Sequence, residues 1–313
     1  MLSVNVVQKY NMQSSGFISR MNKYLKERFH LGQFVPLSLI LAGVLSVGTQ
    51  IYLKQTASLS LVLISALALF IFLLRLRLFD EFKDYEHDLK HYSHRPVPRG
   101  LVSKRELGLV LIPLIILEFV TAFISGLNGL FLFVAAFIYS LLMFKEFFVT
   151  RWIKNHFTTY IFSHEILLFP LFFYLCAING FSITSINNHF FWYLVTYAGC
   201  SMFLLEITRK VRSKDSEIAS KDTYTAQYGI MGASILLLIV SFVMIVSLWK
   251  VIISINLNYS PVLISLFFFG FFCWRLYNFN KRPVIEVSKK VFLSSIYFVF
   301  VSCVVTIFVL INK

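Results

Sequence analysis

The stretch "LVLISALALFIFLLRLRLF", residues 61–79, decides the class of this protein. It is apolar over almost its whole length, and an α-helix needs about 20 such residues to cross the hydrocarbon core of a bilayer. The next stretch, "DEFKDYEHDLKHYSHRPVPRG" at residues 80–100, is rich in acids, histidines and arginines. The pattern predicts a membrane-spanning helix that carries a charged segment out of the lipid.

Similar apolar runs recur from residue 34 to the end of the chain, in which hydrophobic residues make up 58%. The predicted spans are residues 34–53, 57–79, 106–125, 128–144, 158–178, 189–207, 230–253, 260–276 and 291–311. We therefore predict an all-α, polytopic membrane bundle of about nine helices, with residues 34–313 as a single membrane domain. Residues 1–33 have neither a long apolar core nor a small-residue cleavage site, so they are predicted to form a basic amphipathic segment at the membrane surface.

The basic residues are distributed unevenly along the chain, whose net charge is +14. Of its 29 Lys and Arg, 26 fall in residues 1–33, 75–105, 145–154, 209–221 and 275–290, which all lie on one side if nine spans cross the membrane. The positive-inside rule makes that side, and the N-terminus, cytoplasmic. The prediction is a multi-pass protein of the cytoplasmic membrane with its charged loops inside. Because topology and anionic lipids explain the basic charge, no nucleic-acid partner is expected.

The acids that follow residues 61–79 are regularly spaced. On a helix, Asp80, Asp84, Asp88 and Glu81 would lie at about 0°, 40°, 80° and 100°, on one third of the surface. Such like charges repel one another unless something positive offsets them. One interpretation is a solvated helix end neutralised by nearby lysines and arginines. The regular spacing at the end of a span favours the other, a divalent-cation site, in which Mg²⁺ binds carboxylates and phosphate oxygens and Arg95 meets the rest of the phosphate.

A second charged cluster follows the sixth predicted span, in residues 204–229, and faces the same side as the first. Its acids are Glu206, Asp215, Glu217 and Asp222, and its bases are Arg209, Lys210, Arg212 and Lys214. Two such clusters at corresponding depths can close on one ligand, and an anionic ligand bound with metal suits both.

At these residues the chain resembles the UbiA-type intramembrane prenyltransferase superfamily. That family is a bundle of nine helices with an aspartate-rich motif after the second span and another after the sixth. The first motif, N-D-x-x-D-x-x-x-D, has the spacing of Asp80-Glu81-x-x-Asp84-x-x-x-Asp88. It is followed here by "RPVPRGLVS" at residues 95–103, and "TYTAQYG" at residues 223–229 resembles the opening of the family's seventh span.

The second motif departs from the family pattern. An upstream Glu followed by D-x-x-D-x-x-x-D would lie on Glu206 and then Lys210, Ser213 and Glu217, so two of the three aspartate positions carry no carboxylate. Two readings stay open: Asp215 substitutes as a ligand, or Lys210 and Arg212 neutralise the diphosphate in place of a second metal. The family's Tyr-x-x-x-Lys feature is also altered, with Tyr139 present and its lysine shifted to Lys145.

The resemblance implies a Mg²⁺-dependent transfer of a polyprenyl group from its diphosphate to a lipophilic, typically aromatic, acceptor within the membrane. The implied metal ligands are Asp80, Glu81, Asp84, Asp88, Asp215 and Glu217. The basic residues predicted to bind the diphosphate are Arg95, Arg209, Lys210, Arg212 and Lys145. The expected partners are the polyprenyl diphosphate, the acceptor and membrane lipids.

Two ionisable residues lie inside the fifth predicted span, in "IFSHEILLFP" at residues 161–170. Such groups usually face the interior of a bundle, so His164 and Glu165 are candidate proton acceptors for the attacking nucleophile, with a structural contact as the alternative.

Three other functions compete with prenyl transfer. A phosphatidyl-group transferase is disfavoured, because its D-G and A-R pairs are missing around residues 80–88. A catalytically silent lipid-binding relative or a transporter remains the alternative to the prenyl transferase. A transporter would more often show membrane helices broken by Gly or Pro, and the sequence gives little sign of them.

Overall fold

The computed structural model describes residues 16–217 and 223–313, and it is helical throughout those ranges apart from turns and loops. Residues 1–15 of the predicted amphipathic segment and Asp222 of the second cluster lie outside the described residues. The long helices are α3 (Leu31–Tyr52), α4 (Leu59–Lys83), α6 (Lys104–Ile124), α7 (Gly126–Phe144), α11 (His189–Arg209), α12 (Tyr224–Ser254), α13 (Ser260–Lys281) and α14 (Ile285–Ile311). The shorter ones are α2 (Phe17–Arg28), α5 (Tyr85–His91), α8 (Thr150–Asn155), α9 (Phe157–Glu165), α10 (Leu168–Ile178) and the 3₁₀ turns η1 (Glu146–Phe148), η2 (Ile183–Ser185) and η3 (Lys214–Ser216).

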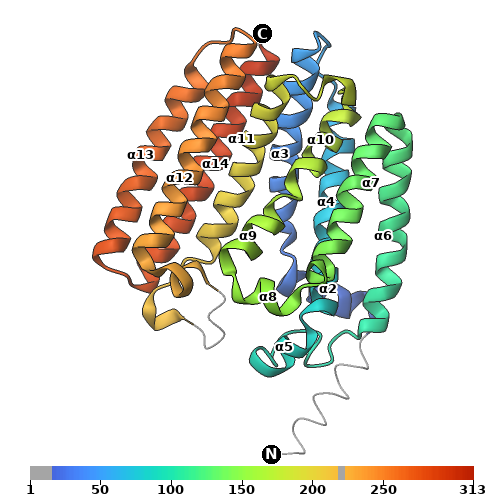
Figure 1. The fold of residues 1–313 in the computed structure, drawn as a ribbon, viewed down its shortest axis with the longest axis vertical. Coiled ribbons are helices and arrows are strands. Elements are labelled where there is room, and N and C mark those ends of the chain that lie inside the picture. Colours follow the sequence, from blue (N-terminus) through green and yellow to red (C-terminus); the bar gives the residue numbers. More distant parts are fainter. Residues whose placement is uncertain (1–15, 218–222) are drawn as a thin grey trace, which may run out of the picture.

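Within the described residues, nine helical segments are long and apolar enough to cross a membrane, with α9 and α10 together forming the fifth. They stand side by side as a bundle, in which each long helix packs against its neighbours in sequence and α14 closes the ring against α3. The short helices α2, α5 and α8 lie together at the lower end in Figure 1, and the C-terminus lies at the upper end. The predicted all-α membrane bundle is confirmed, and the protein is an integral membrane protein.

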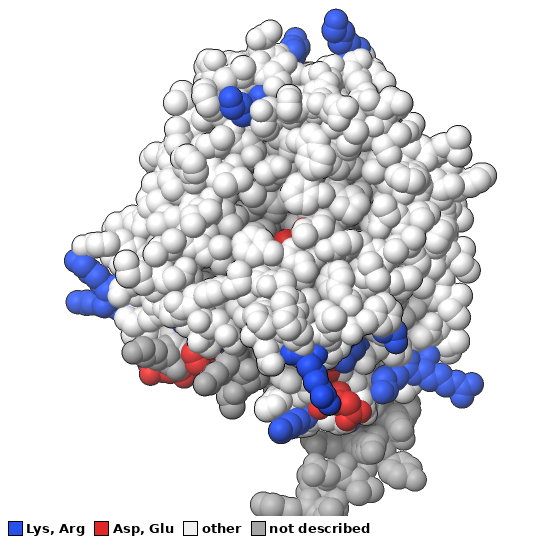
Figure 2. Space-filling view, in the orientation of Figure 1, with Lys and Arg blue, Asp and Glu red and all other residues white. Residues whose placement is uncertain are grey.

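The observed spans extend beyond the apolar runs that predicted them. The second runs to Lys83 instead of residue 79, and the sixth runs to Arg209 instead of residue 207, so the charged clusters begin on the helices themselves. Figure 2 shows the same pattern from outside: an almost uncharged belt crosses the molecule, and charged side chains gather mainly at its lower end. Sidedness relative to the cytoplasm stays a prediction.

Two of the spans are interrupted, which the sequence analysis did not anticipate. The fifth is broken after Glu165, because Pro170 has no N–H to donate to the carbonyl of Ile166 and its ring crowds that carbonyl. The seventh is broken at Gly229, whose φ of 70° and ψ of 173° are not helical. Both interruptions are local, because Ile166 and Leu167 keep helical φ and ψ angles and Gly229 lies five residues after the start of α12.

The acid-rich segment is also not one continuous helix. Helix α4 ends at Lys83, Asp84 has φ −94° and ψ 8°, and α5 starts at Tyr85. Asp88 thus belongs to α5, and the predicted single helical face is interrupted at Asp84.

Helix α2 docks across the lower end of α4. Its Tyr24 is fully buried in a small apolar cluster with Leu78, Val97, Val102 and Leu107. At its ends, Arg20 pairs with Glu106 and Arg28 pairs with Glu81. This docking carries Arg28 to the charged end of α4.

Candidate active site

A cavity of about 570 Å³ lies in the bundle at the level of the two charged clusters. Side chains from the start of α3 and from α4, α7, α9, α10 and α11 line it. The predicted site residues in its lining are Asp80, His164, Glu165, Arg209 and Lys210. Two distant parts of the sequence, one on α4 and one on α11, therefore face a common space, as the two-cluster prediction requires.

The α4 wall presents Arg77, Asp80 and Lys83 to the cavity. The Asp80 carboxylate is 43% exposed, and its oxygens are 3.7 Å from Arg77 Nη1 and 3.7 Å from Lys83 Nζ. These distances are too long for hydrogen bonds. Arg77 and Lys83 therefore attract the Asp80 carboxylate electrostatically but do not form hydrogen bonds with it.

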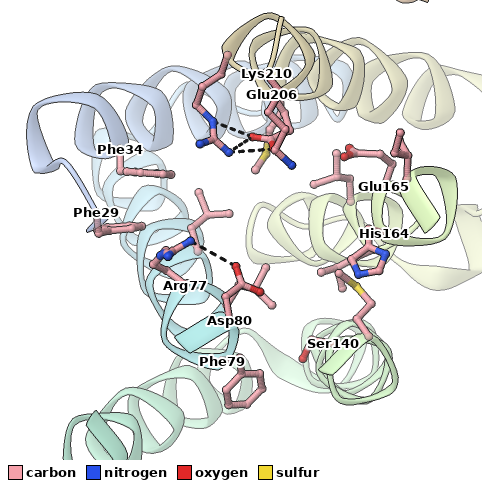
Figure 3. A pocket seen from close by; sticks show the side chains of 18 of the residues that line it. Phe29, Phe34, Arg77, Phe79, Asp80, Ser140, His164, Glu165, Glu206 and Lys210 are labelled. Atoms are coloured by element: carbon pink, nitrogen blue, oxygen red, sulfur yellow. Dashed lines mark hydrogen bonds and ion pairs between the residues drawn. The ribbon is translucent and has the colours of Figure 1, made fainter. Parts of the chain in front are cut away.

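The opposite wall, formed by α11, presents Glu206, Arg209 and Lys210 (Figure 3). Glu206 accepts from Arg209 Nη2 at 2.7 Å and forms an ion pair with Lys210 Nζ at 2.8 Å. The Glu206 carboxylate raises the pKa of Lys210 above its usual value, so this lysine stays charged. On this wall two cations surround the single acid.

Two acids of the first cluster face away from the cavity and are held by arginines. Glu81 Oε1, in a side chain only 1% exposed, accepts from Arg28 Nε at 2.7 Å and from Arg77 Nη2 at 2.8 Å. Asp88 Oδ1 accepts from Arg95 Nη1 at 2.5 Å. On α4, Glu81 points about 100° from Asp80, and Asp88 lies on the separate helix α5, so neither acid shares the orientation of Asp80.

The remaining predicted ligands lie outside the cavity lining. Glu217 accepts from the hydroxyls of Thr223 and Thr225 at 2.5 and 2.6 Å, and Asp215 is exposed on η3. Arg212 Nη1 is 3.4 Å from the Ser216 carbonyl oxygen. Asp84, a predicted metal ligand, and Lys145, a predicted diphosphate-binding residue, are also absent from the cavity lining.

These placements test whether a metal ion fits. Among the described residues, no group of three His, Cys, Asp or Glu side chains is placed to share one ion. Asp80 does offer a hard oxygen to the cavity, and Mg²⁺ is commonly held by one or two carboxylates together with substrate phosphates. The cavity therefore fits one ion that is completed by a phosphate ligand.

The broken fifth span places a base in the cavity. His164 Nδ1 is 2.7 Å from the Tyr160 carbonyl oxygen, which can only accept, so Nδ1 carries the hydrogen and Nε2 carries the lone pair. His164 Nε2 is buried without a hydrogen-bond partner in the described part of the chain. Figure 3 shows His164 and Glu165 across the cavity from Arg77.

Several cavity residues were not predicted from the sequence, chiefly Arg28, Arg77, Tyr160 and Tyr224. For Arg77 a signal exists, because an arginine in a run of leucines within a span usually faces the interior. Arg28 comes from a surface helix, and nothing in its local sequence predicts that it reaches α4.

Comparison with known proteins agrees with this architecture. The sequence model of the UbiA prenyltransferase family matches residues 38–303. No curated protein matches the chain in sequence. Three solved structures share the fold at low identity. A digeranylgeranylglyceryl phosphate synthase has a TM-score of 0.63 and 16% identity, over 94% of this chain and 100% of that one.

The other two structures are of UbiA homologues. The apo structure from Aeropyrum pernix K1 has a TM-score of 0.60 and 14% identity, over 86% of this chain and 97% of that one. The structure from Archaeoglobus fulgidus has a TM-score of 0.55 and 16% identity, over 93% and 100%. The family model matches most of the sequence, which confirms the predicted family and the predicted enzyme class, a prenyl transferase. The chain belongs to the UbiA prenyltransferase family.

Proposed function

We propose that this protein transfers a polyprenyl group from its diphosphate to a lipophilic acceptor inside the cavity. One observation carries the proposal: charged walls from α4 and α11 line the same cavity as apolar side chains. The apolar side chains include Leu73, Leu76, Leu168, Leu171 and Met202. A prenyl diphosphate has the same two parts, a highly charged head and an apolar tail.

The basic side chains supply what the leaving group requires. When the carbon–oxygen bond of the donor breaks, the electron pair leaves with the diphosphate, and negative charge gathers there. Arg77 and Lys83 on one wall, and Arg209 and Lys210 on the other, neutralise that charge. Family members generally use divalent metal ions, and here Asp80 would hold Mg²⁺, which when bound adds positive charge against the same oxygens.

The prenyl carbon left by this step is an allylic cation that water would capture. The apolar walls limit access of water, and the aromatic rings of Phe144 and Tyr160 line the cavity where a cation can be stabilised by a π face. The acceptor's nucleophile forms the new bond to that carbon and releases a proton. His164, which lines the cavity and whose buried Nε2 holds an unshared lone pair, takes that proton.

The acceptor is a ring or an alcohol that dissolves in the membrane, because the cavity is lined by apolar as well as charged side chains. Candidates include a quinone precursor, another aromatic ring, a porphyrin and a phosphorylated polyol. The last is suggested by the digeranylgeranylglyceryl phosphate synthase that shares the fold.

The test uses the purified full chain in detergent with geranylgeranyl diphosphate, Mg²⁺ and one acceptor of each class. The expected result is release of one diphosphate for each prenylated product formed. Tight binding of several prenyl diphosphates without diphosphate release under any acceptor would overturn the proposal in favour of a silent lipid-binding relative. Movement of intact donor across a vesicle membrane would instead indicate a transporter.

A further inference from the structure

The α11 wall has a feature that the proposed function does not explain. On the family pattern, Lys210 and Ser213 stand where aspartates are usual. Ser213 is fully buried, and its hydroxyl lies 2.9 Å from that of Ser216. Lys210 lines the cavity. A positive charge therefore occupies a wall where the family resemblance implies metal ligands.

The acid that remains on this wall is already neutralised. Glu206 is contacted by Lys210 at 2.8 Å and by Arg209 at 2.7 Å. Both oxygens of Glu206 are already contacted by Arg209 and Lys210 at 2.7–2.9 Å, so a divalent ion there would have to displace these cations. By contrast, no cation among the described residues is closer than 3.7 Å to Asp80. Lys and Arg have three and five N–H donors, so after binding one carboxylate both keep donors for an anion.

The α4 wall also has basic side chains with N–H donors available to an anion. Arg77 Nε is buried and has no hydrogen-bond partner among residues 16–217 and 223–313. Lys83 Nζ is 3.7 Å from the nearest Asp80 oxygen, so the contact between them is an ion pair without a hydrogen bond. An anion between the two walls would meet basic donors from both sides and one available carboxylate, Asp80.

We infer that Lys210 and Arg209 replace a second metal ion and bind the donor diphosphate directly, so that the site holds one divalent cation, at Asp80. This inference rests on the proposed function for the identity of the ligand. It also selects between the two possibilities that the sequence left open. Asp215 and Arg212 lie outside the cavity lining, so neither takes part, and Arg209 takes the role expected of Arg212.

The first measurement counts the metal ions. Mn²⁺, which has a paramagnetic signal, is titrated into the full chain in detergent with inorganic diphosphate present, and bound Mn²⁺ is measured by electron paramagnetic resonance. We expect one Mn²⁺ per chain, and none in Asp80→Asn. Two Mn²⁺ per chain, or none in the wild type, would overturn the inference.

The second measurement separates Lys210 from its neighbours. Lys210→Gln removes a charged donor, so diphosphate binding should weaken about tenfold or more, with the Mn²⁺ count unchanged at one. Lys210→Arg should keep most of the affinity, which excludes misfolding as the cause. Arg212→Gln is the matched control from the same segment and should bind normally. Equal affinity in Lys210→Gln and the wild type would contradict the inference.

These experiments use no prenyl donor, so their result is independent of turnover. If one Mn²⁺ binds and Lys210 matters, but no acceptor is ever prenylated, the prenyl-transfer proposal fails and the account of the anion site stands. If transfer occurs and two Mn²⁺ bind, the prenyl-transfer proposal stands and the inference of a single metal ion fails.

Discussion

Helix α4 carries two groups of charged side chains little more than one turn apart, and they are built differently. Arg75 is fully buried: its Nε donates to both oxygens of Glu118 at 2.8 and 2.7 Å, and its Nη1 donates to Ser140 at 2.9 Å. Its guanidinium carbon also lies 4.4–5.0 Å from the ring centroids of Phe72, Phe79 and Phe137. Asp80 is 43% exposed and has its cations at 3.7 Å.

The difference shows how a membrane protein uses charge in two ways. Arg75 and Glu118 pair closely and join α4 to α6 in the buried interior, and of their side-chain polar atoms only Arg75 Nη2 lacks a hydrogen-bond partner among the described residues. Asp80 and Lys83 attract each other weakly and face a cavity, so a ligand can take over their contacts. Between Arg75 and Asp80, burial together with close pairing distinguishes the structural charge from the functional one.

The strongest test of this comparison is to break the buried pair. Arg75→Met should lower the free energy of unfolding by about 3–5 kcal/mol, because it leaves the Glu118 carboxylate buried without a partner. The measurement is the fraction folded in an SDS titration of the purified protein. The double variant Arg75→Met with Glu118→Leu should recover most of the loss. A double variant as unstable as the single one would show that ring packing, and not the unpaired charge, was responsible.

The complementary change removes the loosely paired acid. Asp80→Asn should reduce kcat/KM for diphosphate release by about 10²- to 10³-fold, because the variant loses the carboxylate that would hold Mg²⁺ against the leaving diphosphate. Its unfolding free energy should change by less than about 1 kcal/mol, as for other exposed pairs. Chelation of Mg²⁺ should impair the wild type and leave the variant unchanged.

The matched control for Asp80 is Glu86→Gln, which removes an exposed acid from α5. It should keep wild-type activity. If Asp80→Asn were instead as destabilised as Arg75→Met, the division between structural and functional charges on α4 would be wrong.

The third prediction separates the two ionisable residues of the fifth span. His164→Gln should lower product formation about 10²-fold, because the cavity loses its unpartnered ring nitrogen. Glu165→Gln should have a smaller effect, because the hydrogen bond to the Tyr160 carbonyl orients the lone pair of His164 and not a group on Glu165. Equal losses in both variants, measured as prenylated product per folded molecule, would mean that the two act as a pair.

The sequence predicted the fold well because the signal for a membrane span is strong and local. The run at residues 61–79 needs no information about its neighbours to indicate a helix in lipid. Where the helices end was less predictable, because α4 and α11 continue past their apolar runs into charged residues that water can reach.

The site was predicted only in part, for a physical reason. Asp80, Glu81 and Asp88 look equivalent as letters, and their roles differ because about 100° of helical rotation turns Asp80 to the cavity and Glu81 to α2. Which cation meets which acid depends on packing between distant segments. Arg28 reaches Glu81 only because α2 docks on α4, and no local pattern contains that contact.

The smallest effect is expected at a charge pair that lies outside the bundle. Arg99 donates to both oxygens of Glu27 at 2.8 and 2.7 Å, as closely as Arg75 binds Glu118, yet the pair is open to solvent. This hydrogen-bonded pairing lowers the pKa of Glu27, so its stabilisation is present above the ordinary pKa of a glutamate and fades as the pH falls through the lowered value. Arg99→Gln should therefore cost at most about 1 kcal/mol at pH 7, and less in 1 M salt, where the screening length is about 3 Å. A loss as large as that of Arg75→Met would show that closeness of pairing alone, without burial, makes a charge structural in this protein.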